Sequence, residues 1–428
     1  MTVKDMLGRS GVVTKEEALR MIAERYRPPV IPSEEISIGL SLGRIMARDI
    51  TSPVDLPEFD RSTMDGYAVR SADTFGAAEG RAAYLRIVGD IPMGKLPDRG
   101  VTTGQAMRIA TGGALPPGAD AVVMFEHTQP VDVEGVEVVK AVAPRENVTL
   151  AGEDIRKGEP VLSKGHVIRP QDMAALAGMG IMHVPVFERP RVAIISTGNE
   201  IVSADTVPGP GQIRDSNSYS LEGLITQVGG VPVKMGIIPD DYGRLRRTLE
   251  DAMQHCNLVL FTGGSSVGTA DFTANVINDM GPPGVLVHGV SIKPGKPLII
   301  GLAKRKDRNE QVPVFGLPGH QAAVAICFEV FVKPVLAKLT GAVPHPALEG
   351  ISPSRLVKAK LARSISSSPG REDHVRVTLE KRDDGLWARP VFGASGLIST
   401  LVRAVGTVVV PVNKIGIEAG EEVEVRLF

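Results

Sequence analysis

The stretch from Asn257 to Met280 constrains the fold of this chain more than any other. An apolar run, Leu258–Phe261, leads into Thr262–Gly268, which contains three glycines and two serines, and a helical pattern resumes at Phe272. A short apolar run of this kind is typical of a strand buried on both faces of a parallel sheet. The glycines let a ligand approach the backbone, and N–H and hydroxyl groups can donate to it. Strand, turn and helix start therefore predict an anion-binding turn.

The same alternation of strand and helix extends from Arg191 to about Leu339 and predicts a doubly wound parallel sheet. The expected strands are 192–195, 232–237, 258–261, 298–300 and 312–315, and the expected helices are 218–228, 242–255, 272–280 and 321–339. Pro334 is expected to kink the last helix. In such a sheet, ligands bind at the carboxyl ends of the strands.

The flanking segments have a different pattern. Thr14–Glu17 is a capping box that opens a helix to Tyr26, and a short helix is expected at Leu42–Ala47. Short β-like runs separated by Gly and Pro turns predict an inserted all-β domain, and the tail from Arg355 again favours a small β barrel or sandwich. The β-like runs of the insertion are 67–69, 84–88, 106–109, 121–125 and 136–139.

Composition excludes several classes of protein. The 428 residues carry a net charge of −1, so no basic excess indicates a nucleic-acid or anionic-membrane partner. No apolar run reaches the length of a membrane span, and the N-terminus lacks the apolar core of a signal peptide. The two cysteines, Cys256 and Cys327, form no C-x-x-C pair and are expected to be buried free thiols. A cytoplasmic protein is therefore expected.

Acidic residues follow the expected strand ends. Ser196-Thr-Gly198 and Thr262-Gly263 both come directly after strands, and they are followed by Glu200 and Asp271. A third strand ends before Asp240-Asp241. Carboxylates beside phosphate-binding turns suit Mg²⁺, which takes few carboxylates and shares its coordination with phosphate. The alternative for Asp241 or Asp271 is a helix N-cap.

Two further segments are candidates for anion binding. Lys293 and Lys296 lie on a turn stiffened by Pro and Gly, where they could hold an oxyanion, although an ordinary solvated turn would have the same sequence. Leu317-Pro-Gly319 starts a helix whose N–H groups could also hold an anion. His320 next to it is as compatible with a structural cap as with a ligand contact.

Other motifs are rejected or have a simple explanation. Gly89–Lys95 fits most of a phosphate-binding P-loop, but Leu96 replaces the required Ser or Thr, and Gly263–Gly268 does not match the dinucleotide-binding pattern. No metalloprotease or esterase motif is present. A hairpin turn alone could explain Asp65-Gly66.

Several motifs together resemble the molybdopterin molybdenumtransferases of the MoeA family, to which the E domain of gephyrin is similar. The likeness covers nearly the whole chain in order, and the ordered set is specific although each motif alone is weak. The matching segments are 59–69, 108–112, 119–123, 151–155, 196–200, 262–268 with Asp271, 293–297 and 317–319.

The resemblance implies an α/β multidomain fold and a homodimer with its active site between protomers. It also implies a reaction in which adenylylated molybdopterin is cleaved, AMP leaves, and molybdate enters the dithiolene with the help of Mg²⁺. The adenylyltransferase and molybdoenzyme chaperones are possible protein partners. The expected domains are a central MogA-like α/β domain (1–27 and 186–340), a linking subdomain (28–58 and 143–185), an inserted β domain (59–142) and a C-terminal barrel-like β domain (341–428).

Carried over by motif, the resemblance also assigns roles to residues. Asp60, Thr111, Glu200, Asp240 and Asp271 fall at catalytic positions, and the last three would hold Mg²⁺. Substrate-binding positions are Asp65, Thr197, Gly198, Gly263, Gly264, Ser265, Ser266, Lys293, Lys296, Gly319, His320, Arg371, Arg376, Ser395 and Ser399.

One departure from the family concerns the start of the last helix. The family continues Leu-Pro-Gly with Asn-Pro and, two residues later, Ser, whereas this chain has His320-Gln321 and Ala323. A titratable ring thus replaces an amide next to the anion site, which bears on the choice between molybdate and tungstate. Two rival functions also fit the resemblance: a gephyrin-like scaffold without activity, and an adenylyltransferase that acts one step earlier.

Overall fold

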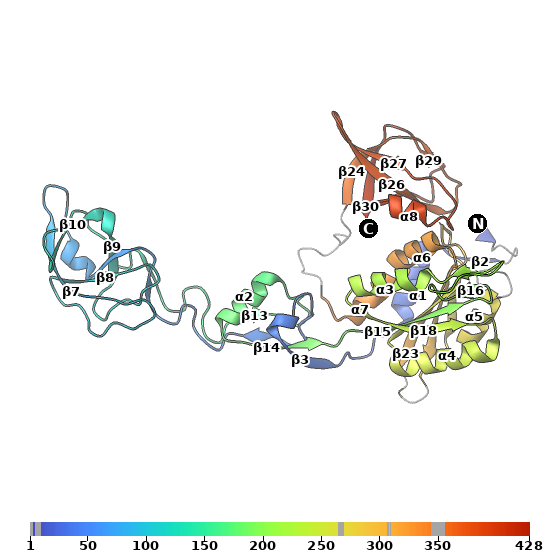
Figure 1. Cartoon of the computed structure of the whole chain (residues 1–428), viewed down its shortest axis with the longest axis horizontal. Helices are drawn as coiled ribbons and strands as arrows, with labels where there is room; N and C mark the ends of the chain where they lie inside the picture. The colour runs from blue at the N-terminus through green and yellow to red at the C-terminus, as the bar shows by residue number, and fades with distance from the viewer. Residues whose placement is uncertain (1–2, 5–9, 264–268, 306–307, 309, 344–355) are drawn as a thin grey trace.

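The computed structural model describes residues 3–4, 10–263, 269–305, 308, 310–343 and 356–428. The molecule is elongated (Figure 1). A β lobe that contains β7 to β10 occupies one end, a small domain with α2 lies in the middle, and the α/β domain and the C-terminal β domain share the other end. Within the described ranges, no helix is both long and apolar enough to span a membrane.

The central sheet of the α/β domain contains four parallel strands and an antiparallel edge. In spatial order the strands are β18 (Val231–Ile238), β15 (Arg191–Thr197), β19 (Leu258–Gly263), β23 (Gln311–Leu317), β22 (Ile299–Lys304) and β20 (Gly284–His288). The first four are parallel, and β22 and β20 run antiparallel to their neighbours. The predicted α/β domain is confirmed, but the strand expected at 298–300 corresponds to β22, which is antiparallel rather than parallel. β20 is an edge strand that the sequence pattern did not indicate.

Helices cover both faces of this sheet, because successive strand residues point to opposite sides. Val192 and Ile194 of β15 face one apolar core, and Ala193 and Ile195 face the other. The first core is covered by α1 (Lys15–Arg25), α3 (Asn217–Gln227), α6 (Gln321–Cys327) and α7 (Lys333–Leu339), and the second by α4 (Tyr242–His255) and α5 (Thr269–Asp279). A π-helical segment, Phe328–Val332, separates α6 from α7 just before Pro334, which cannot donate a helical hydrogen bond.

The N-terminal helix begins as predicted, whereas one other predicted helix is wrong. The Thr14 hydroxyl accepts a hydrogen bond from the Glu17 amide at 3.1 Å, which caps α1. The short helix expected at Leu42–Ala47 is absent, because Gly43 adopts a φ of +72° and the two residues after Arg44 form bridges to other segments. Left-handed backbone and β pairing both prevent helical hydrogen bonds there.

The inserted lobe is all β, as predicted, and forms a six-stranded sheet in which β10 is a strand that the sequence pattern did not indicate. The order is β10 (Thr128–Pro130), β11 (Gly135–Val138), β7 (Ala83–Asp90), β8 (Gln105–Ile109), β6 (Gly66–Val69) and β9 (Ala121–Met124). Two small apolar cores fill its sides. β5 (Arg61–Ser62) pairs with β12 (Val148–Thr149), so the chain enters and leaves the lobe side by side.

The middle domain is built from two segments far apart in the sequence. β3 (Ser33–Ser37) pairs with β14 (His183–Phe187), and β4 (Ile50–Thr51) pairs with β13 (Pro160–Leu162). α2 (Pro170–Gly178) packs on these strands through an apolar cluster that includes Leu176.

Asp172 stabilises the start of α2, and its removal should therefore destabilise the middle domain. Its carboxylate accepts hydrogen bonds from the Arg169 amide at 2.8 Å and the Arg169 side chain at 2.9 Å, and it lies 2.7 Å from His166 Nε2. Burial alone would raise the pKa of Asp172, but Arg169 and His166 hold it well below its usual value.

We expect Asp172→Ala to lower the free energy of unfolding of this domain by about 1–3 kcal/mol. The wild-type contribution should be present above the usual aspartate pKa of about 4 and be lost as the pH falls below it. Amide hydrogen exchange in α2 measures the effect. Asp98→Ala, which removes an exposed carboxylate beside Arg99, is the control. Equal exchange in both variants would contradict the prediction.

The C-terminal domain is a closed five-stranded barrel. Its strands are β26 (Glu372–Arg382), β27 (Gly385–Pro390), β24 (Leu356–Leu361), β30 (Glu422–Leu427) and β28 (Gly406–Val410), and β28 pairs back with β26. A short strand of the α/β domain, β21 (Ile292–Lys293), adds to β26 in parallel. The barrel is thereby attached to the domain that carries Lys293.

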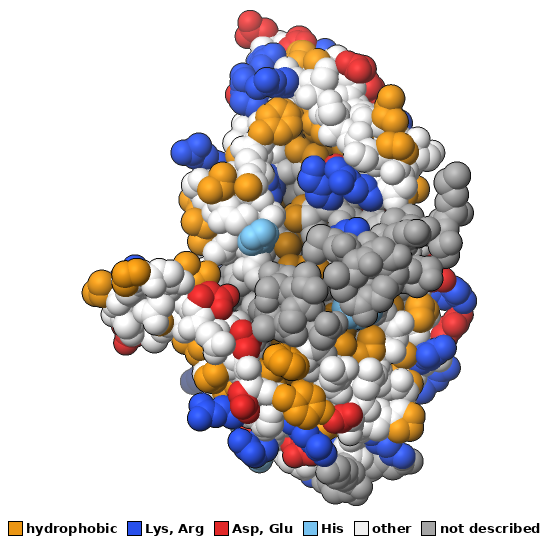
Figure 2. All heavy atoms as spheres, turned by 90° about the vertical axis from the view of Figure 1, so that its right-hand side faces the viewer, with side chains coloured by type: hydrophobic (Ala, Val, Ile, Leu, Met, Phe, Trp, Pro, Cys, Tyr) orange, Lys and Arg blue, Asp and Glu red, His pale blue; other side chains and the backbone are white. Residues whose placement is uncertain are grey.

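The remaining strands and the last α-helix are short. They are β1 (Val3–Lys4), β2 (Ser10–Val12), β16 (Ile201–Val202), β17 (Ile213–Arg214), β25 (Ile365–Ser366), β29 (Gly416–Ile417) and α8 (Ser399–Arg403). Cys256 and Cys327 are both free and buried, as predicted. On the face shown in Figure 2, acidic and basic side chains are interspersed over the visible surface, in keeping with the net charge of −1.

Candidate functional site

The carboxyl ends of the four parallel strands lie along one edge of the central sheet, which we call the strand-end rim. Thr197 at the end of β15 is in register with Ile238 of β18 and with Gly263 of β19, and Thr262 is in register with Leu317 of β23. The segments that follow these strands therefore start side by side. The sequence predicted this convergence for the two Ser/Thr-Gly turns.

The first two turns leave no room for a side chain. A Cβ atom on Gly263 would lie 1.9 Å from the carbonyl oxygen of Thr197, and Gly263 has a φ of +111°. A Cβ atom on Gly198 would lie 2.7 Å from Glu200 Oε2, and its φ is +141°. Glycine is required at Gly263, because a side chain there would clash with the backbone. At Gly198 the positive φ favours glycine, and a side chain would displace the Glu200 carboxylate. Gly264, Ser265 and Ser266 lie outside the described residues.

Glu200 and Asp240 come together at the strand-end rim. The Asp240 amide donates to Asn199 Oδ1 at 3.2 Å. Asp240 Oδ1 is buried and accepts no hydrogen bond from any described group. Burial and the negative charge of Glu200 both raise the pKa of Asp240. Two carboxylates are thus held near each other with one oxygen unsatisfied, which is unfavourable unless a cation or a donor joins them.

This arrangement fits a divalent cation. Hard cations take carboxylate oxygens, and one near Glu200 would satisfy Asp240 Oδ1 and offset the repulsion between the two acids. Asp271 belongs to the first turn of α5, which follows the neighbouring strand β19, but its side chain is not among those described. Among the side chains that are described, no group of three acidic, histidine or cysteine residues could hold a metal.

Asp241, in contrast, caps a helix. Its carboxylate accepts a hydrogen bond from the Arg244 amide at 2.7 Å at the start of α4. The N-cap alternative is therefore confirmed for this residue.

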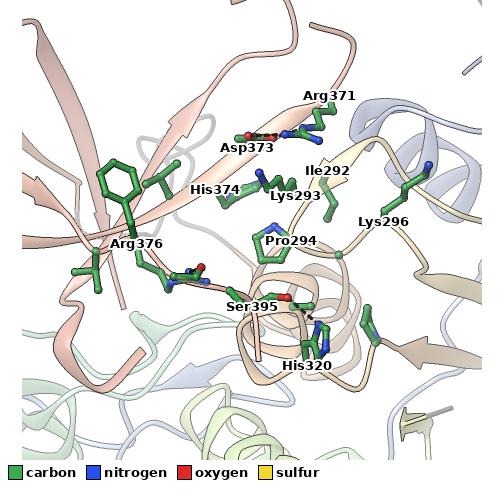
Figure 3. Close-up of a pocket in the computed structure, with 18 of the residues that line it drawn as sticks. Ile292, Lys293, Pro294, Lys296, His320, Arg371, Asp373, His374, Arg376 and Ser395 are labelled. Carbon is green, nitrogen blue, oxygen red and sulfur yellow. Dashed lines mark hydrogen bonds and ion pairs between the residues drawn. The ribbon is translucent and has the colours of Figure 1, made fainter. Parts of the chain in front are cut away.

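A pocket of about 680 Å³ lies beside the strand-end rim, between the α/β domain and the barrel (Figure 3). One wall is the turn that carries the two lysines and the start of α6, and the other is β26 with the segment after β27. The lining residues are 292–297, 318, 320, 323, 365, 366, 371, 373–376 and 391–395. Pro318 and His320 belong both to this lining and to the segment after β23, so the pocket is continuous with the rim.

The cations of this pocket are only partly compensated. Arg371 forms an ion pair with Asp373 at 2.8 Å (Figure 3). No described carboxylate lies within ion-pair distance of Lys293, Lys296 or Arg376. Because β21 pairs with the barrel, the lysine turn is also part of a domain contact rather than a free solvated loop.

Arg376 is the most unusual of these cations. Its residue is 7% exposed, and burial lowers the pKa of its guanidinium. Nη2 donates to the Gly393 carbonyl at 2.9 Å, and the buried Nε has no partner in the described structure. A buried guanidinium without an acid partner is costly, and an anion bound beside it would offset that cost.

His320 does not cap its helix. It occupies the N-cap position of α6 without a capping hydrogen bond from its side chain, and its Nδ1 lies 2.8 Å from Ser395 Oγ (Figure 3). The ring therefore connects the two walls of the pocket. Gln321 Nε2 donates to Ser216 Oγ at 3.1 Å, whereas Ser399 is exposed at the start of α8 and does not line the pocket.

Asn217 is a rim residue that the sequence did not indicate. Its Nδ2 donates to Thr262 Oγ1 at 2.9 Å and to the Gly319 carbonyl at 2.8 Å, and its Oδ1 is buried without a described partner. It thus fixes the ends of β19 and β23 relative to each other. The only local signal was a polar residue in an otherwise ordinary helix start.

Asp60, Asp65 and Thr111 lie in the inserted lobe at the other end of the molecule (Figure 1). Asp65 Oδ1 accepts hydrogen bonds from the Thr111 amide at 2.7 Å and its hydroxyl at 3.1 Å, and Asp60 Oδ1 accepts from the Ala151 amide at 2.8 Å. The hairpin explanation of Asp65 is wrong, because β6 pairs with β8 and β9 and not with β5. Within one chain, these residues do not reach the strand-end rim.

Comparisons with known proteins match this architecture part by part. The family models are "MoeA N-terminal region (domain I and II)" at residues 13–180, "Probable molybdopterin binding domain" at 193–338 and "MoeA C-terminal region (domain IV)" at 358–428. The molybdopterin molybdenumtransferase of Nostoc sp. is 34% identical over 91% of this chain and 88% of that protein. That of Bacillus subtilis is 31% identical over 99% of this chain and 96% of that protein.

A solved structure agrees with these relatives. The crystal structure of the molybdopterin biosynthesis MoeA protein from Pyrococcus horikosii superposes with a TM-score of 0.81 at 37% identity, over 97% of this chain and 99% of that one. The fold and its matches define a class of proteins built around a molybdopterin-binding domain. The chain belongs to the MoeA family of molybdopterin molybdenumtransferases, and it is an enzyme of molybdenum cofactor biosynthesis.

Proposed function

We propose that this enzyme is a molybdenum insertase. It cleaves adenylylated molybdopterin, releases AMP, and inserts molybdate into the dithiolene of the pterin. The observation that carries the proposal is the pocket with three cations, Lys293, Lys296 and Arg376, that lack acid partners in the described structure. Molybdate is a small dianion, and a rigid cluster of this kind supplies both charge and hydrogen bonds to such an oxyanion.

The strand-end rim would bind the other substrate. The glycine turns at Gly198 and Gly263 bring the backbone close enough to contact a phosphate, as anion sites at strand ends do. Glu200 and Asp240 would hold Mg²⁺, which supplies neutralisation of phosphate charge when bound. Water attacks a phosphorus of the phosphoanhydride as the bridging P–O bond breaks, so that AMP and the pterin phosphate separate. The step depends mainly on alignment and charge compensation, so the protein need not supply a covalent nucleophile.

His320 would tune the choice of oxyanion, because it lines the pocket in place of the family's usual amide. Its hydrogen bond to Ser395 fixes the ring at the junction of the rim and the pocket. The proposal therefore places the pterin phosphates at the rim and molybdate in the pocket.

The proposed active form is a homodimer. Asp60, Asp65 and Thr111 are fixed by hydrogen bonds in the inserted lobe, far from Glu200 and Asp240 of the same chain (Figure 1). In a dimer whose two elongated protomers lie antiparallel, the inserted lobe of each protomer would lie at the strand-end rim of the other. Two-fold symmetry would then form this contact twice. In this arrangement, Asp60, Asp65 and Thr111 would contact the substrate bound at the partner's strand-end rim.

The proposal is tested with purified protein, adenylylated molybdopterin, Mg²⁺ and molybdate, with AMP release as the measurement. We expect Glu200→Ala to reduce the rate of release about 100-fold or more, because a charged group aimed at the phosphates is lost. Asp251→Ala, which removes an exposed carboxylate from α4 of the same domain, should leave the rate unchanged.

Two outcomes would contradict the insertase. If wild type and Glu200→Ala release AMP at the same rate, the strand-end rim does not take part in the reaction. Consumption of ATP with unadenylylated molybdopterin, without AMP release from the adenylylated form, would instead indicate adenylyl transfer.

A further inference from the structure

We propose that Lys15 and Glu372 are positioning residues that hold Lys293 in place within the oxyanion pocket. The inference rests on the proposed function, because it concerns how that pocket is assembled. Lys15 belongs to the first helix of the α/β domain, and Glu372 begins the barrel strand that forms the opposite wall. Neither residue lines the pocket itself.

The backbone around Lys293 joins three distant parts of the chain. The Ser291 amide donates to the Val13 carbonyl at 2.8 Å, and the Glu372 amide donates to the Ser291 carbonyl at 2.9 Å. β21 then continues in parallel with β26, with Lys293 opposite Asp373. The strand that carries Lys293 is therefore held between the segment before α1 and the barrel strand β26.

The hydrogen-bonded ladder between β21 and β26 is short, so side chains must help to keep these two strands paired. β21 has two residues, and β26 meets it only at its first two positions. So few hydrogen bonds at the edge of two domains would open readily on their own.

The ion pair between Lys15 and Glu372 spans the same ladder. Lys15 Nζ donates to Glu372 Oε2 at 2.6 Å, and the two side chains are 26% and 12% exposed. The other oxygen, Oε1, lies 2.9 Å from His374 Nε2, and His374 lines the pocket. Burial would raise the pKa of Glu372, but His374 and Lys15 outweigh it and lower this pKa to about 2. Glu372 is thus a buried anion that needs its cation.

The ladder sets the distance between the cations of the two walls. Lys293 lies on β21, and Arg376 lies on β26 four residues beyond Glu372. If the ion pair is removed, β26 can shift relative to β21, and the two cations no longer meet one oxyanion together. Small misplacements of binding groups have large effects on affinity and rate.

The test compares Lys15→Met, Lys15→Arg and Lys333→Met in the full-length protein. Lys333→Met is a matched control, because it removes a half-buried lysine that pairs with Glu329 at 2.8 Å on a helix of the same domain. Molybdate binding is measured by titration calorimetry, and AMP release is measured over a range of molybdate concentrations. Hydrogen exchange is followed at the Ser291 and Glu372 amides and, as a reference, in β15.

We expect Lys15→Met to weaken molybdate binding about 10-fold and to raise its KM to a similar extent, with little change in kcat at saturation. Exchange should accelerate at Ser291 and Glu372 but not in β15. Lys15→Arg should restore affinity, and Lys333→Met should match wild type. A role in general stability alone would change exchange in β15 and leave the molybdate KM unaltered.

The outcomes separate the two proposals. If wild type binds molybdate and Lys15→Met binds it equally well, the positioning role is overturned but the insertase proposal stands. Failure of wild type to bind molybdate or release AMP overturns the insertase and, with it, this role.

Discussion

Replacing Arg376 with methionine is expected to weaken molybdate binding about 10- to 100-fold, the loss typical of a charge-assisted hydrogen bond in a buried site. Methionine keeps most of the apolar volume and removes the buried cation. Gly393, the only described acceptor for this guanidinium, is exposed, so its carbonyl can turn to water after the change. The barrel should therefore stay folded, and the loss should concern the anion.

The measurement is molybdate titration of the full-length protein, with the melting temperature as a check on folding. Arg389→Met is the matched control, because Arg389 lies in the same barrel but is exposed and paired with Glu380. Arg376→Lys should recover part of the affinity, since it restores the charge without the planar donor group. Equal affinity in wild type and Arg376→Met would show that the pocket holds its anion elsewhere or binds none.

The elements of this fold were predictable where one physical signal dominated. Apolar runs marked β15, β19 and β23 because both faces of these strands are buried, whereas the edge strand β18 is only partly buried. Amphipathic spacing marked α4 at its observed bounds. The helix predicted at Leu42–Ala47 was wrong because the apolar residues of this segment fit the spacing of a β-strand as well as that of a helix. Only the pairing of Met46 with Val186, far away in the sequence, decides between them.

The candidate site also has a part that was predictable from the sequence and a part that was not. The rim was predictable because parallel strands place their carboxyl ends at one edge, so a strand end in the sequence is also a location in space. No comparable rule predicts the pocket from the sequence. Its walls meet through β21 and β26, and no local pattern indicates that these two strands pair. They are separated in the sequence by β22, β23, α6, α7, β24 and β25. The family resemblance indicated Arg371 and Arg376, but His374 and Lys15 carry no family or local signal, and Asn217 shows only a polar residue at a helix start.

Mixed dimers should test whether two chains share one active site. Asp240→Asn removes a rim charge while keeping its shape, and Asp60→Asn removes a lobe charge while keeping an acceptor for the Ala151 amide. We expect each homodimer to lose about 100-fold or more of its AMP-releasing activity. A mixed dimer carries both changes in one site and neither change in the other, so it should regain about half of the wild-type rate.

The mixed dimers are obtained by co-expressing the two variants with different affinity tags and purifying on both. The control pairs Asp240→Asn with Glu200→Ala, two changes on the same rim. Each site of that dimer then has a defective rim, so its activity should stay as low as that of the parents. If the Asp60→Asn and Asp240→Asn pair also stays inactive, the lobe does not serve a partner's rim. Asp60, Asp65 and Thr111 would then act within their own lobe. There, Asp60 accepts a hydrogen bond from the Ala151 amide and Asp65 accepts one from the Thr111 amide, which already gives these residues a structural role.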